Sequence, residues 1–155
     1  MPWIRKIFLL LSNEEQIDKS LLPDNVEIVL HKDFIPKAFL PTFNSTTIEM
    51  FLYNIQDLGE YFIYANDDML PTGKMKPTDF FENGKIKIQW RRALFTQNLN
   101  MFSYQCRNNC VSICKKLGFE FDNVIVRPVH SYTPMIKSHC KEAFDTIHDL
   151  ILPYI

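Results

Sequence analysis

Four short apolar runs, each bounded by polar residues, constrain the fold of this chain most strongly. They are Ile7 to Leu11, Val26 to Leu30, Tyr61 to Tyr64 and Val124 to Val126. Continuous apolar runs of this length, closed by turn-forming residues, are typical of strands buried on both faces, as in a parallel sheet. Helical patterns separate the runs, so the sequence predicts an α/β domain with a mostly parallel sheet and flanking helices.

Three stretches have the apolar spacing of a helix, namely residues 46–55, residues 94–117, and the stretch from Pro134 to Pro153. The spacing of Thr46 and Glu49 predicts a capping box at the start of the first helix. Gly118 is expected to end the second helix in a left-handed C-cap. Two prolines and two glycines within residues 70–87 predict a loop there.

Length and composition narrow the class of protein. With 155 residues, the chain is expected to form a single domain spanning residues 1–155. A net charge of -1 gives little support to nucleic-acid binding, and four glycines without a glycine-rich motif argue against a glycine phosphate cradle. No apolar stretch reaches the length of a membrane span, so we expect a soluble, cytoplasmic protein that can still act at the inner face of the membrane.

The four cysteines suggest free thiols rather than disulfides or a zinc site. Cys106, Cys110 and Cys114 recur every four residues, as on one helix face, and Cys140 stands alone. No CxxC knuckle is present, so we expect free, largely buried thiols in a reducing compartment.

The strongest signal for chemistry is the segment that follows the third apolar run. Asn66, Asp67 and Asp68 come directly after that strand. Ligands of parallel α/β sheets bind beyond the carboxyl ends of the strands, and adjacent carboxylates suit Mg²⁺ or Mn²⁺. The alternative is a solvated turn, which Asn and Asp also favour.

Two other places could bind phosphate. Asn44 and Ser45 precede a helix, whose free N–H groups and dipole attract anions, although both residue types also serve as ordinary N-caps. Arg91 and Arg92 could grip a phosphate in bidentate fashion, or mark an exposed helix start.

A histidine could supply acid–base chemistry. His130 lies between the last strand and the final helix, and imidazole titrates near neutral pH. An ordinary surface histidine is the alternative, and His31 also follows a strand.

Taken together, these segments resemble the second conserved region of the Stealth family of hexose-1-phosphate transferases, which includes bacterial capsular polysaccharide phosphotransferases. The residues that carry the resemblance are Leu40 to Ser45, Ile48 and Glu49, Phe62 to Tyr64, and Asn66 to Asp68. Pro2 to Ile7 looks like the segment before that region, and Pro77 to Phe81 looks like the segment after it. His130 and Pro134 are similar to the third conserved region.

The resemblance implies a nucleotide-sugar-transferase-like core. It implies transfer of a sugar 1-phosphate, such as N-acetylglucosamine 1-phosphate, from a UDP-sugar to a glycan hydroxyl, with release of UMP. Asp67 and Asp68 would hold Mg²⁺ or Mn²⁺, and His130 with Asp67 would be catalytic. The residues expected to bind substrate are Asn44, Ser45, Asn66, Arg91 and Arg92.

The sequence also departs from the family pattern. Nothing in it matches the first conserved region with its Val-Asp-Gly turn, or the arginine-bearing segment and fourth region beyond the histidine. We therefore expect the central part of such an enzyme, with a complementing chain and a membrane-bound synthesis complex as further partners. The alternatives are a glycosyltransferase that releases UDP, and an inactive remnant that binds a partner.

Overall fold

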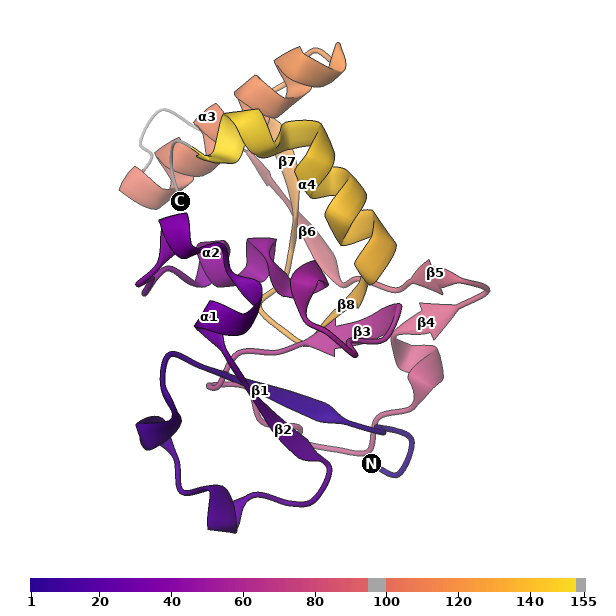
Figure 1. The fold of residues 1–155 in the computed structure, drawn as a ribbon. Coiled ribbons are helices and arrows are strands. Elements are labelled where there is room, and N and C mark those ends of the chain that lie inside the picture. Colours follow the sequence, from indigo (N-terminus) through magenta and orange to yellow (C-terminus); the bar gives the residue numbers. More distant parts are fainter. Residues whose placement is uncertain (95–99, 153–155) are drawn as a thin grey trace.

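The protein is a mixed α/β structure, seen here in a computed structural model that describes residues 1–94 and 100–152 (Figure 1). The strands are β1 (Ile7–Leu11), β2 (Val26–Leu30), β3 (Tyr61–Tyr64), β4 (Phe81–Glu82), β5 (Lys85–Ile86), β6 (Trp90–Leu94), β7 (Val124–Pro128) and β8 (Thr133–Ile136). The helices are α1 (His31–Phe34), α2 (Ser45–Met50), α3 (Met101–Leu117) and α4 (Lys137–Ile151). Short 3₁₀ turns lie between them, of which η4 (Leu52–Asn54) contributes to the core.

All four predicted strands form, but their pairing differs from the prediction. β1 and β2 pair in parallel, whereas β3 with β8, β4 with β5, and β6 with β7 pair antiparallel. The prediction of a mostly parallel sheet is therefore wrong for the described residues, which form four two-stranded sheets. An apolar run reports burial on both faces, but it carries no information about the direction of the neighbouring strand.

The helices also depart from the predicted boundaries. α2 begins at Ser45, because the side-chain oxygen of Asn44 accepts the backbone N–H of Thr46 at 3.0 Å, and the predicted Thr46–Glu49 capping box does not form. α3 begins at Met101 rather than at residue 94, since residues 90–94 form β6; residues 95–99 lie outside the described residues. Gly118, with φ of 76°, makes the predicted left-handed cap.

The predicted loop at residues 70–87 contains a small hairpin. β4 and β5 are joined by Asn83 and Gly84, both in the left-handed region with φ of 51° and 73°. Asn-Gly is the dipeptide that two-residue hairpin turns favour, so this turn was readable from the sequence.

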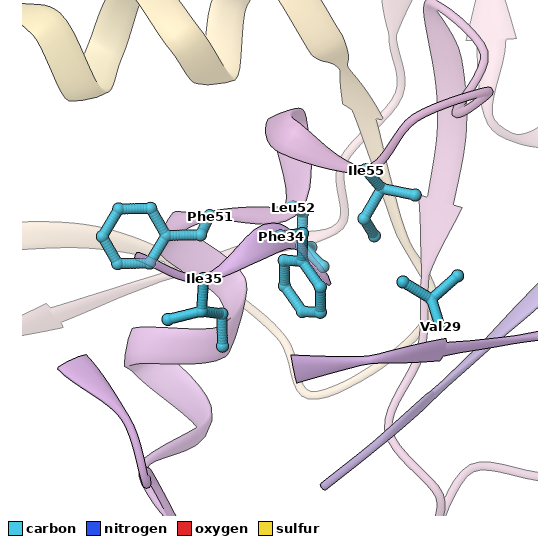
Figure 2. Close-up of a cluster of buried hydrophobic side chains, with 6 residues drawn as sticks. All are labelled: Val29, Phe34, Ile35, Phe51, Leu52 and Ile55. Carbon is cyan, nitrogen blue, oxygen red and sulfur yellow. The ribbon is translucent and has the colours of Figure 1, made fainter. Parts of the chain in front are cut away.

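The hydrophobic core lies between the β1–β2 pair and α4. Six buried side chains form its centre: Val29, Phe34, Ile35, Phe51, Leu52 and Ile55 (Figure 2). Phe51 is only 2% exposed, and its ring centroid lies 5.3 Å from that of Phe39 and 5.3 Å from that of Phe144. Because Phe144 comes from α4, this aromatic cluster joins the C-terminal helix to the N-terminal half of the chain.

The start of α4 is fixed against the segment before β3. The backbone N–H of Lys137 donates to the carbonyl of Glu60 at 2.8 Å, and its ammonium donates to the carbonyls of Ile55 and Leu58. These bonds hold β8, which ends at Ile136, in place beside β3.

The cysteines are free thiols, as predicted, and each of the four is half-buried. Burial raises the pKa of the Cys110 thiol, with a smaller contribution from Cys106 and Cys114, and burial also raises the pKa of Cys140. Among the described residues, no helix has the length and apolar character needed to cross a bilayer.

Candidate active site

The antiparallel pairing of β3 with β8 brings the two most promising segments together. Tyr64, the last residue of β3, is paired with Thr133, the first residue of β8. In an antiparallel pair, the end of one strand lies beside the beginning of the other. The Asn66–Asp68 segment that leaves β3 therefore meets the segment from His130 that enters β8.

Two side-chain contacts join these segments. Nε2 of His130 lies 3.3 Å from Oδ2 of Asp68, although the two residues are 62 positions apart in the sequence. The hydroxyl of Tyr132 donates to the carbonyl of Met69 at 3.1 Å. His130 and Asp68 are 65% and 66% exposed, so the imidazole and the carboxylate are both open to a substrate. We call Asp67, Asp68 and His130 the Asp-His site.

Glu49 and Tyr64 belong to the same neighbourhood, and sequence reasoning did not assign them to it. Burial raises the pKa of Tyr64 to about 12, together with the charge of Glu49, a hydrogen bond to Glu49 and the charge of Asp67. Burial also raises the pKa of Glu49, whereas the Tyr64 hydroxyl and the charge of His130 lower it. Glu49 is part of the segment that carries the family resemblance. It was not assigned to the site because the capping-box pattern predicted that its carboxylate would bind a backbone N–H of the helix.

Replacing Tyr64 with Phe is expected to raise the pKa of Glu49 further, because the hydroxyl that stabilises the ionised carboxylate is lost. The folded pKa of Glu49 is already above its unfolded value. Its stabilising contribution is therefore present at low pH and is lost as pH rises through the folded pKa, and in Tyr64→Phe this loss extends to higher pH. Carbon-detected NMR titration of labelled glutamates measures the shift.

Tyr61→Phe is the matched control for this titration. Tyr61 is on the same strand, and its ring packs edge-on against Phe81 at 5.4 Å. The Glu49 titration should be unchanged in Tyr61→Phe. An unchanged titration in Tyr64→Phe as well would contradict the hydrogen bond.

One of the side chains expected to bind substrate, that of Asn44, is already engaged in local structure. The Asn44 side chain caps α2, which has only six residues, so the alternative of ordinary N-capping describes Asn44. Asn66 is half-buried, and its backbone carbonyl accepts the backbone N–H of Met69 at 3.2 Å in a turn. Ser45 is exposed. Substrate binding by Asn44, Ser45 and Asn66 stays a prediction.

Arg91 and Arg92 lie on β6, so their assignment to an exposed helix start is wrong. Arg91 is opposite Arg127 of β7, and Arg92 is opposite Val126. Successive side chains of a strand point to opposite faces, so these two guanidinium groups cannot grip one phosphate together. Phosphate binding by either one stays a prediction.

The donor set at the Asp-His site fits a hard divalent cation completed by a substrate. No group of three or more His, Cys, Asp or Glu side chains that could hold a metal ion occurs within the part of the chain that the structure describes. Mg²⁺, however, keeps several waters and is often held by one or two carboxylates together with substrate phosphates. Asp67 and Asp68 can supply those carboxylates, and the negative charge that helps to raise the pKa of Tyr64 would be offset by a cation.

Similarity to known proteins decides the family. The family model "Stealth protein CR2, conserved region 2" matches residues 1–89. This chain belongs to the Stealth family. The matched range corrects one expectation from the sequence: Pro2 to Ile7 and Pro77 to Phe81 lie inside the second conserved region rather than beside it.

Curated relatives of this Stealth-family chain are named as polysaccharide phosphotransferases. The capsular polysaccharide phosphotransferase LcbA of Aeromonas hydrophila is 32% identical over 148 residues, which cover 93% of this chain and 41% of that protein. A capsular polysaccharide phosphotransferase of Neisseria meningitidis serogroup B is 29% identical over 167 residues, covering 100% of this chain and 43% of the relative.

An exopolysaccharide phosphotransferase of Lactiplantibacillus plantarum is 42% identical over 89 residues, which cover 56% of this chain and 26% of that protein. The chain thus spans about two fifths, or less, of the length of these relatives. In the relatives from Neisseria and Aeromonas, the similarity extends well beyond residue 89 of this chain.

Proposed function

We propose that this chain forms part of the active site of an enzyme that moves a sugar 1-phosphate from a UDP-sugar to a glycan hydroxyl and releases UMP. The observation that carries the proposal is the contact of His130 with Asp68 across 62 residues of sequence. The names of the curated relatives support phosphotransfer in capsule or exopolysaccharide synthesis. UDP-N-acetylglucosamine is the donor that we propose as representative.

In this reaction the acceptor oxygen attacks the phosphorus atom that bears the sugar. A new P–O bond forms, the P–O bond to UMP breaks, and the acceptor hydroxyl loses its proton. Nε2 of His130 faces Asp68, so the carboxylate favours a proton on Nε2 and leaves the Nδ1 lone pair to accept the acceptor proton. His130 is the general base in this proposal.

Asp67 and Asp68 would hold Mg²⁺ or Mn²⁺, and such an ion supplies charge neutralisation at a diphosphate. The protein groups proposed to orient the donor are the amide of Asn66 and the side chains at the start of α2 (Asn44 and Ser45). In this proposal, the parallel β1–β2 pair is the start of a nucleotide-sugar-transferase-like core.

The nucleotide product distinguishes this function from its alternatives. The chain is incubated with UDP-N-acetylglucosamine, a glycan acceptor and Mg²⁺, and the nucleotides are separated by ion-exchange chromatography. UMP is expected, and its release should stop when the metal is chelated. UDP as the product would instead indicate a glycosyltransferase.

The absence of any nucleotide product would mean that this chain does not turn over the donor by itself. Calorimetric titration of the UDP-sugar then separates the two remaining cases. Metal-dependent binding of the donor would indicate a chain that needs a complementing polypeptide for turnover. No donor binding would favour a remnant that binds a partner.

A further inference from the structure

Positive charge is concentrated in one part of the chain. Residues 83–119 carry seven of the seventeen basic residues and none of the eighteen acidic ones, although the whole chain has a net charge of -1. Five of the seven lie on β5, between β5 and β6, on β6, or in the first half of α3: Lys85, Lys87, Arg91, Arg92 and Arg107. Of these five, Lys87 forms an ion pair with Glu82 at 3.3 Å, and the other four have no ion pair among the described residues. Their unpaired positive charge would attract an anionic partner.

Two arginines face each other across the β6–β7 ribbon. Arg91 of β6 is directly opposite Arg127 of β7, and we call these two residues the arginine pair. Like charges directly opposite one another destabilise a strand pair. Such an arrangement is relieved when an anion lies between the two guanidinium groups.

Nothing within residues 1–94 and 100–152 supplies that anion. The ion pairs of the described residues involve neither arginine. The Nε atom of Arg127 is buried and has no hydrogen-bond partner there. A buried donor without a partner is unfavourable, so the arginine pair is an incomplete arrangement in the chain alone.

The arginine pair lies a short distance from the Asp-His site. The N–H of Val129 donates to the carbonyl of Gln89 at 3.0 Å, so the ribbon continues to the residue before His130. Arg127 precedes His130 by three residues, so the two positions are at most about 11 Å apart along the backbone. Figure 1 shows β6 and β7 leading from the region of β3 and β8 towards α3.

We infer that the arginine pair binds a phosphodiester group of an anionic sugar-phosphate chain. This inference rests on the proposed function, whose product carries a phosphodiester at each transferred unit. Guanidinium groups recognise phosphate oxygens through two parallel hydrogen bonds, and two of them can enclose one group. A phosphodiester chain that enters or leaves the Asp-His site along the ribbon would place a linkage between Arg91 and Arg127.

The test compares two neighbouring variants, Arg91→Gln and Arg92→Gln. Both remove one positive charge from an exposed side chain, but the two side chains lie on opposite faces of β6. The probe is a fluorescent oligomer of N-acetylglucosamine units joined by phosphodiesters, and its affinity is measured by anisotropy. Arg91→Gln is expected to weaken binding about tenfold, the loss of roughly one charge-assisted hydrogen bond, and Arg92→Gln by less than about twofold.

Other anions identify the source of the phosphate. The same titration is run with a neutral oligosaccharide of equal length, UDP-N-acetylglucosamine, inorganic phosphate, vesicles containing phosphatidylglycerol, and single-stranded DNA. Preference for the phosphodiester oligomer supports the inference. Equal or tighter Arg91-dependent binding of any of the others overturns it, as do equal losses in the two glutamine variants.

Arg91→Glu adds a check that the fold is intact. This substitution places a carboxylate opposite Arg127, so the melting temperature should rise while binding of the oligomer is lost. Arg92 is opposite Val126, so Arg92→Glu should not raise the melting temperature. A lower melting temperature in Arg91→Glu than in Arg92→Glu overturns the inference. If the oligomer binds in an Arg91-dependent way but no UMP is released, only the proposed function is contradicted. If UMP is released but Arg91→Gln does not weaken binding of the oligomer, only this inference is contradicted.

Discussion

Replacing His130 with Gln is expected to lower the rate of UMP release by on the order of 10²- to 10⁴-fold, the range that general-base catalysis supplies. In this proposal, Nε2 of the imidazole faces Asp68 and Nδ1 acts as the base. The substitution removes Nδ1. Because the imidazole is 65% exposed, folding should be little affected. The measurement is kcat/KM from the initial rate of UMP formation, with the melting temperature recorded for each variant.

His139→Gln is the matched control for this experiment. His139 is an exposed residue of α4, nine positions further along the chain, and the same chemical change there should leave kcat/KM unchanged. Equal rates in the wild type and in His130→Gln would remove the assigned role of the imidazole. A loss in His130→Gln accompanied by a large fall in melting temperature would assign His130 to structure instead of catalysis.

Replacing Phe51 with Ala is expected to lower the free energy of unfolding by about 3–5 kcal/mol, the usual result when a buried phenylalanine is truncated. Phe51 is 2% exposed and contacts the rings of Phe39 and Phe144, so its removal leaves a cavity where the N-terminal half meets α4. Urea denaturation followed by circular dichroism measures the difference.

Phe43→Ala provides the comparison at the other end of α2. The Phe43 side chain is 94% exposed, so the same substitution should change the free energy of unfolding by less than about 0.5 kcal/mol. Similar effects in both variants would contradict the placement of the core around Phe51. A loss in Phe51→Ala much smaller than a cavity predicts would lead to the same conclusion.

The apolar runs predicted the strands well because their limits are local. The apolar runs at residues 7–11, 26–30 and 61–64 are followed by Ser12, His31 and Ala65-Asn66, and the structure has the same strand bounds. Strand direction is not local, since β8 reaches β3 only after a long connection. For that reason the apolar runs correctly predicted the strands but wrongly predicted that they pair in parallel.

The candidate site shows the same division between local and distant information. The residue types at Asp68 and His130 indicated their chemistry, but we expected the site at the carboxyl edge of a parallel sheet. They meet instead because β3 ends where β8 begins. Glu49 was missed because the pattern with Thr46 offered a plausible local partner, whereas its partner in the structure, Tyr64, is fifteen residues away.

The register of β3 against β8 has a consequence for how this sequence can vary. Thr133 faces Tyr64, and His130 and Asp68 are attached a few residues beyond that pair. Sliding one strand by a single position would shift the imidazole by about 3.3 Å and turn every side chain of that strand to the other face. Insertions between positions 131 and 136 should therefore be rejected by selection, while added residues in the exposed stretch at 70–74 should be accepted, because no strand is displaced by them.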